Sequence, residues 1–103
     1  MKTLEEICFG LITHSGDAKS LLYEALNAGK KGDFEKARQK IKESEEDQLK
    51  AHRVHMELIT RELNEKDIDF SLILVHAEDQ MMQTELLSKL VEEFLEIYEK
   101  LEK

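Results

Sequence analysis

Residues 70–82 read FSLILVHAEDQMM, and this stretch decides the fold of the chain. Its apolar side chains recur all round a helix, although a helix on the surface of a small bundle needs only one apolar stripe. Polar residues interrupt the stretch at His76, Glu78, Asp79 and Gln80. We therefore predict a helix with two burial surfaces, one of which is covered by self-association.

The surrounding sequence predicts three helices joined by short turns. The third helix is expected over about residues 69–102, and it becomes amphipathic from Leu86 onward. A turn at residues 64–67 precedes it. The second helix is expected over residues 33–63, with Asp33 as its N-cap. The first is expected over residues 3–28 and ends at the glycines and lysines of residues 29–32. This order predicts an all-α, antiparallel up-down-up bundle.

The inward-facing pattern is regular in the first predicted helix and interrupted by polar residues in the second. A heptad seam runs through the first helix, with small side chains in its later positions (Leu4, Cys8, Leu11, Ser15, Ala18, Leu22, Ala25, Gly29). The inward stripe predicted for the second helix is polar in its middle (Phe34, Ala37, Ile41, Glu45, Gln48, His52, His55, Ile59, Leu63). The second helix is therefore expected to fray toward solvent or to face polar groups of another subunit.

Length and charge exclude several classes of protein. The 103 residues are 41% hydrophobic, contain no proline and carry a net charge of -8, which predicts one folded domain over residues 1–103. The acidic balance argues against nucleic-acid binding, and no apolar run is long enough to insert into a membrane. The acidic start lacks the apolar core of a signal peptide, and the single cysteine, Cys8, forms no internal disulfide. These features predict a cytoplasmic protein.

The chemistry of the chain rests on histidine and carboxylates. His76 and Asp79 are three residues apart and His76 and Gln80 four apart, so they share a helical face that Gln83 extends by one turn. A neutral imidazole is a good nucleophile near pH 7, which indicates a proton or phosphoryl site. A lone histidine at a helix–helix contact is the commoner arrangement. His52 and His55 are three residues apart, so a metal-binding pair remains an alternative. The sequence contains no Glu-x-x-His pair of the kind that a di-iron bundle uses.

Four segments together resemble one known family. Residues 15–20 (SGDAKS), 32–34 (GDF), 51–53 (AHR) and above all 76–82 (HAEDQMM) resemble the enzyme IIA component of the lactose/cellobiose (chitobiose) class of the bacterial sugar phosphotransferase system. The resemblance runs from about Leu4 to the C-terminus without a large gap, and the three-helix layout agrees with it.

The resemblance implies a function, a site and an assembly. His76 corresponds to the active histidine, which accepts a phosphoryl group from the phosphocarrier HPr, as a tele-phosphohistidine, and passes it to the cognate IIB component. Gln80 and Gln83 are candidate hydrogen-bond donors to the phosphoryl oxygens. The chain would be a phosphotransferase component that forms a homotrimer of nine helices. Asp79 corresponds to the aspartate that meets its symmetry mates around one shared cation, and Mg²⁺ suits carboxylate oxygens.

The chain departs from this family pattern at two positions. Glu78 stands where glutamine is common, which is expected to have little effect on an exposed turn. Gln80 stands where a second histidine is frequent, and an amide cannot titrate. A non-catalytic oligomeric adaptor and a metal-binding bundle are the alternative functions. The sequence does not select among lactose, cellobiose and chitobiose as the transported sugar.

Overall fold

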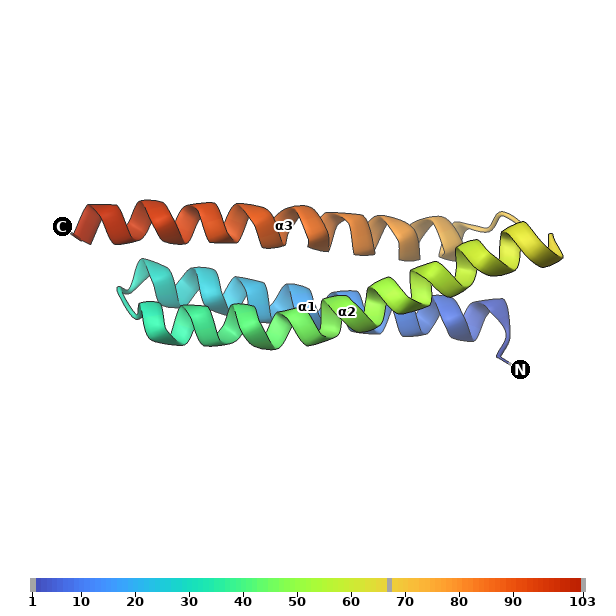
Figure 1. Ribbon diagram of the computed structural model, residues 1–103, viewed down its shortest axis with the longest axis horizontal. Helices are drawn as coiled ribbons and strands as arrows, with labels where there is room; N and C mark the ends of the chain where they lie inside the picture. The colour runs from blue at the N-terminus through green and yellow to red at the C-terminus, as the bar shows by residue number, and fades with distance from the viewer. Residues whose placement is uncertain (1, 67, 103) are drawn as a thin grey trace.

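The computed structural model describes residues 2–66 and 68–102, and all regular structure in these ranges is helical. Three helices, α1 (Leu4–Lys30), α2 (Phe34–Glu65) and α3 (Leu72–Glu102), form a rod of 55 × 20 × 18 Å. The chain runs up, down and up, so that α1 and α3 are parallel (Figure 1). The predicted all-α three-helix bundle is therefore confirmed. The predicted limits of the domain at residues 1 and 103, and Asp67 in the second predicted turn, lie outside the described residues.

Local hydrogen bonds fix the first helix and the first turn. The Thr3 hydroxyl caps α1 by accepting from the backbone N–H of Glu6. At the other end α1 continues to Lys30, two residues beyond the prediction, because the N–H of Lys31 still reaches the carbonyl of Ala28 at 3.1 Å. Gly32 then reverses the chain with a φ of +81°, a conformation that glycine adopts without strain.

The second connection differs more from the prediction. α2 extends to Glu65 and ends at Lys66, whose φ of 54° is left-handed. α3 begins at Leu72 rather than near residue 69, because Ser71 is the residue that caps it. The Ser71 hydroxyl accepts from the N–H of Leu74 at 3.2 Å. Residues 68–70 therefore belong to the connection and not to the helix.

The core is divided into two apolar clusters. The cluster near the start of α3 contains Cys8, Leu11, Ala51, Leu58, Leu74, Ala77 and Met81. The cluster at the other end contains Leu22, Ala25, Ala28, Ala37, Ile41, Val91 and Leu95. Buried hydroxyl groups of Ser15, Ser44 and Thr84 lie between them in sequence on all three helices. The predicted seam of α1 is confirmed, because its residues from Cys8 to Gly29 are buried.

The predicted inward stripe of α2 is confirmed at Ala37 and Ile41 and is wrong at four later positions. The buried residues are Ala37, Ile41, Ser44, Ala51 and Leu58. Glu45, His52, Ile59 and Leu63, which were expected to face inward, are exposed. The small side chains of Ser44 and Ala51 let α2 lie against α1, with which it makes its most extensive contact. Beyond Ile41 the inward face of the helix is thus shifted by about one residue relative to the prediction.

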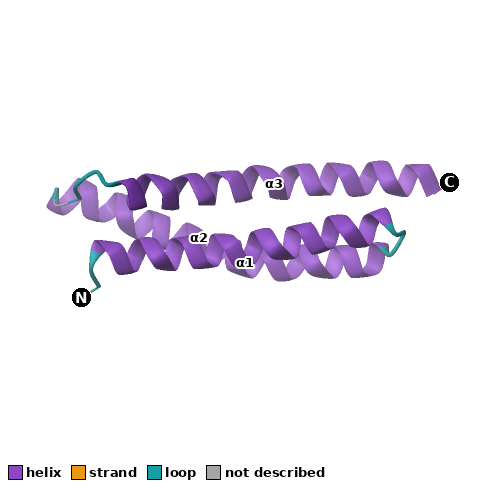
Figure 2. Cartoon of the chain, turned by 180° about the vertical axis from the view of Figure 1, so that it is seen from behind, coloured by secondary structure: helices purple, strands orange, loops and turns teal. Residues whose placement is uncertain are grey.

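α2 and α3 make the least contact of the three helix pairs. α2 lies beside α1 near the first turn and approaches α3 toward the second connection, as the views from both sides show (Figures 1 and 2). Polar side chains bridge α2 and α3 at three levels in the part of the chain that the structure describes. Arg38 pairs with Glu99, Gln48 donates to Ser88 at 3.2 Å, and His55 contacts Glu78. No helix within the described ranges is long and apolar enough to cross a bilayer.

Candidate functional site

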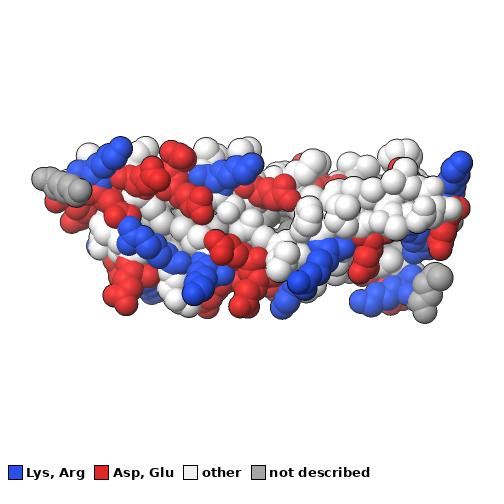
Figure 3. Space-filling view, viewed as in Figure 1, with Lys and Arg blue, Asp and Glu red and all other residues white. Residues whose placement is uncertain are grey.

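α3 carries a second apolar stripe on its outer side. The exposed large apolar residues of this outer stripe are Leu72, Val75, Met82, Leu86, Leu90, Phe94, Ile97 and Leu101. Leu74, Ala77 and Met81 of the same helix face the core. Uncharged atoms gather over the part of the molecule where α3 starts, and charged groups cover the other end (Figure 3). The two-sided apolar character predicted for residues 70–82 is confirmed, and the outer stripe continues to the end of α3.

Asp79 lies within the outer stripe. Val75 precedes it by four residues, Met82 follows it by three and Leu86 by seven, so apolar side chains flank it along one face of α3. The side chain is exposed in the single chain. Its Oδ2 accepts a hydrogen bond of 2.7 Å from the Nε2 amide of Gln83. A charged group inside an apolar face requires either solvent or a charge partner.

His76 lies at the edge of the same stripe. It belongs to the second turn of α3 and its side chain is exposed, so it is not the packed histidine of a helix–helix contact. It borders a groove of about 530 Å³ between α2 and α3. We call this the α2–α3 groove, and its lining residues are Leu58, Ile59, Glu62, Ile68, Phe70, Leu72, Leu74, Val75, His76, Glu78, Asp79 and Met82. The groove thus brings His76 and Asp79 together at an open, largely apolar surface.

The two predicted glutamine donors have different surroundings. Gln83 follows His76 by seven residues, and its amide is engaged with Asp79. This bond uses one of the two N–H groups of the amide. Gln80 is half-buried, and its backbone carbonyl accepts from the hydroxyl of Thr84 at 2.8 Å. The role of both as phosphoryl donors stays a prediction.

Glu78 is not on an exposed turn, contrary to the prediction. It is inside α3, and its side chain is 23% exposed. Oε2 of Glu78 lies 2.5 Å from Nδ1 of His55, whose side chain is 24% exposed. Burial raises the pKa of the Cys8 thiol, and the nearby charges of Glu78 and Glu5 raise it further. Glu78 therefore lies where α1, α2 and α3 meet.

The remaining histidines form no metal centre in the described residues. The rings of His52 and His55 are 6.4 Å apart between centroids, but no three His, Cys, Asp or Glu groups converge in a way that could hold an ion. His55 faces Glu78 rather than a metal. A metal at Asp79 would therefore need carboxylates from other copies of the chain. The exposed Asp79 carboxylate could contribute to such a site, because it keeps one oxygen outside its bond to Gln83.

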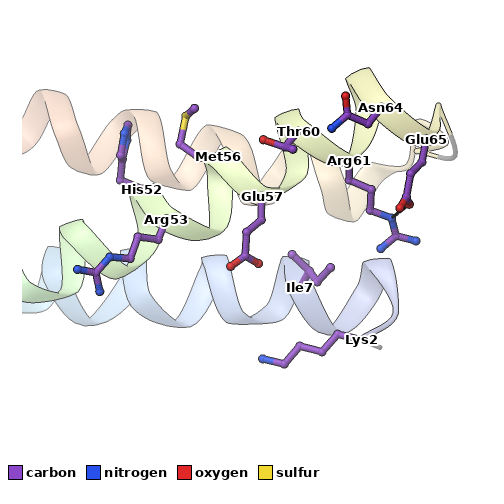
Figure 4. A pocket seen from close by; sticks show the side chains of 10 residues that line it. All are labelled: Lys2, Ile7, His52, Arg53, Met56, Glu57, Thr60, Arg61, Asn64 and Glu65. Atoms are coloured by element: carbon purple, nitrogen blue, oxygen red, sulfur yellow. Dashed lines mark ion pairs between the residues drawn. The ribbon is translucent and has the colours of Figure 1, made fainter.

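A second groove, of about 730 Å³, lies between α1 and the latter half of α2. Lys2 and Ile7 line it from the N-terminal part of the chain, and Glu57 and Arg61 reach toward α1 from α2 (Figure 4). Arg61 pairs with Glu65 at 3.8 Å. His52 borders this groove, but His76 and Asp79 do not, so it is separate from the histidine site.

Comparison with known proteins identifies one family. The family model described as "PTS system, Lactose/Cellobiose specific IIA subunit" matches residues 6–99. The N,N'-diacetylchitobiose-specific EIIA component of Escherichia coli is 42% identical over 95% of this chain and 84% of its own length. The lactose-specific EIIA component of Staphylococcus epidermidis is 38% identical over 89% of this chain and 88% of its own.

Solved structures agree with this match. The cellobiose-specific enzyme IIA from Bacillus anthracis superposes with a TM-score of 0.93 at 35% identity, covering 99% of this chain and 94% of the other. A solution structure of a chitobiose-specific IIA protein in complex with HPr superposes with a TM-score of 0.86 at 38% identity, covering all of both chains.

Proposed function

Because the chain belongs to the lactose/cellobiose-specific IIA family of the sugar phosphotransferase system, we propose that His76 is the residue that carries its phosphoryl group. The chain is a phosphotransferase component that relays a phosphoryl group during sugar uptake. The proposed donor is HPr, and the proposed acceptor is the cognate IIB component. A IIA relative whose structure is solved together with HPr supports the choice of donor.

The exposure of His76 beside Asp79 is the observation that carries this proposal. A phosphoryl carrier must meet two protein partners in turn, so its nucleophile has to be reachable from outside. His76 is exposed at the border of an open groove, whereas His55 is half-buried and engaged with Glu78. His52 and His14 have no place in the α2–α3 groove.

The transfer requires positioning more than acid–base chemistry. The lone pair of Nε2 of His76 attacks the phosphorus atom, the bond between phosphorus and the donor atom breaks, and a new N–P bond forms. The acceptor on IIB then attacks the same phosphorus, and His76 leaves as a neutral imidazole after proton exchange with solvent. Because the incoming group is already activated, orientation of the imidazole supplies most of the catalysis.

The outer stripe of α3 supports a homotrimer. Its eight large apolar side chains are exposed over the whole helix, and closed three-fold symmetry would bury the same stripe on each copy. Three Asp79 carboxylates would then converge at the axis. One Mg²⁺ per trimer would neutralise their mutual repulsion, with Asp79 as the protein ligand and water completing the shell. A cytoplasmic location is part of the same proposal, in accord with a free, buried Cys8.

Reconstitution tests the assignment of His76. The chain is incubated with phosphoenolpyruvate, enzyme I and HPr, and its intact mass is measured. The wild-type chain should gain one phosphoryl group, and His76→Ala should gain none while it keeps the helical circular dichroism signal. His52→Ala and His14→Ala are the controls and should be labelled fully. A labelled His76→Ala protein would contradict the site, and an unlabelled wild-type chain would favour the adaptor function.

A further inference from the structure

Among the three bridges between α2 and α3, the one nearest His76 differs in character. Arg38–Glu99 lies on the surface, with side chains 59% and 37% exposed. Gln48–Ser88 is a neutral hydrogen bond between half-buried side chains. His55–Glu78 places a carboxylate and an imidazole in contact at 2.5 Å, with each side chain only about a quarter exposed. A carboxylate that is this far removed from water needs a partner on the neighbouring helix.

The buried ring nitrogen of His55, Nδ1, is the atom that faces Glu78. Nδ1 is buried, and no hydrogen bond of regular geometry reaches it from the described residues, so the Glu78 carboxylate is its contact. An N–H at Nδ1 is present in the imidazolium and in one neutral tautomer, and either form can face a carboxylate. Glu78 in turn reaches the junction with α1, where its charge acts on the Cys8 thiol. The contact thus joins α2 and α3 at the level of the bundle where Cys8 of α1 is buried.

This level is the one that carries the candidate site. Glu78 is two residues from His76 and directly precedes Asp79. The start of α3 packs on the core through Leu74, Ala77 and Met81, whereas Phe70 of the connection and Leu72 of the first turn are exposed. Helix ends fray unless side chains anchor them. α2 and α3 make the least contact of the three helix pairs, and at this level the polar bridge adds to the apolar packing of Leu58 in the core cluster that contains Leu74.

We propose that His55 is a positioning residue for the phosphoryl relay, because its contact with Glu78 fixes α2 against the turn of α3 that holds His76. The proposal rests on the assignment of His76 as the phosphoryl acceptor. His55 itself does not touch the reacting atoms. It keeps the imidazole of His76 in a fixed orientation relative to the docked donor, where small displacements are costly to the rate.

The test compares the bridges near the two ends of the helix bundle, His55–Glu78 and Arg38–Glu99. Initial rates of phosphoryl transfer from phosphorylated HPr give kcat and KM for each variant. His55→Phe keeps a ring but removes Nδ1, and it should lower kcat about tenfold with KM changed less than about twofold. His55→Asn restores an N–H at the position of Nδ1 and should recover most of the lost kcat. Glu99→Gln breaks the surface bridge and should leave kcat within about twofold of wild type.

Two results would overturn the proposal. One is a wild-type kcat in His55→Phe, and the other is an equal loss of kcat in Glu99→Gln, which would indicate a general effect on the bundle. If His55→Phe lacks the helical signal, Glu78→Ala replaces it under the same criteria. A wild-type chain that accepts no phosphoryl group would contradict the assignment of His76. Full transfer by every variant would contradict only the role proposed for His55.

Discussion

At the scale of single residues, Cys8 shows how burial determines chemistry. Its side chain is fully buried in the apolar cluster near the start of α3. The pKa of the thiol is raised above its ordinary value of 9.0, first by burial and then by the charges of Glu78 and Glu5. A thiol that ionises less readily is a poorer nucleophile. Cys8 therefore acts as a small core residue, as predicted from its place on the heptad seam.

The raised pKa of Cys8 predicts a loss of stability at alkaline pH. As pH rises through about 9, the thiol ionises in the unfolded chain before it does in the folded chain, so the unfolded state binds fewer protons. The free energy of unfolding should then fall by at most about 1.4 kcal/mol per pH unit from this group. Urea unfolding at pH 7 to 10 should show a shallower decline in Cys8→Ala than in wild type. Parallel curves would contradict the raised pKa.

Asp79 gives a second prediction at this scale. If three Asp79 side chains meet at an axis, Asp79→Leu removes their repulsion and completes the apolar outer stripe. The variant should remain a trimer, melt at a higher temperature and lose any stabilisation by Mg²⁺, which thermal unfolding with and without a chelator measures. Asp17→Leu on α1 is the control and should keep the response to Mg²⁺. An Asp79→Leu trimer that folds but accepts no phosphoryl group would place the carboxylate at the reacting site instead.

The sequence located the helical face that carries His76 and Asp79, whose roles stay predictions, and it missed contacts between helices. His76 and Asp79 stand in a recognisable segment of one helix. The contact between His55 and Glu78 joins residues far apart in sequence, on α2 and α3, and depends on the rotation of α2. Ile59 and Leu63 are apolar yet exposed, and because the prediction places them inward the predicted stripe of α2 lies on the wrong side there. Small or polar inward residues such as Ser44 gave too weak a signal to correct it.

At the scale of elements, the start of α3 depends on one hydroxyl group. Ser71 caps the helix through the N–H of Leu74, five residues before His76. The sequence prediction placed this start near residue 69, because the apolar run begins at Phe70 and hides the cap. Phe70 is exposed in the connection, so hydrophobicity alone does not mark the boundary.

Removal of this cap should loosen the first turn of α3. Ser71→Ala is expected to cost about 1 kcal/mol of unfolding free energy, whereas Ser71→Asp keeps an accepting oxygen and should cost little. Hydrogen exchange at the Leu74 amide should accelerate in Ser71→Ala only. Equal protection of this amide in both variants would show that the hydroxyl does not hold the helix start.

At the scale of the whole molecule, the outer stripe is the feature that a single chain leaves unexplained. The three-helix order followed from turn and cap signals, but the division of the core into two clusters did not, because it depends on how three helices align. Leu86→Lys places a charge in the outer stripe and should convert the proposed trimer to monomers. Sedimentation equilibrium should give about three times the 12.0 kDa chain mass for wild type. Tyr23→Lys, on the exposed side of α1, should remain a trimer, and a wild-type monomer would contradict the assembly.

The measurement that tests the central claim most directly is the position of the phosphoryl group on the wild-type chain. The protein is phosphorylated through HPr, digested at mildly alkaline pH to preserve the N–P bond, and sequenced by tandem mass spectrometry. We predict a single modified residue, His76, in the peptide that spans the start of α3. A phosphoryl group on His14, His52 or His55, or on none of the histidines, would contradict the account.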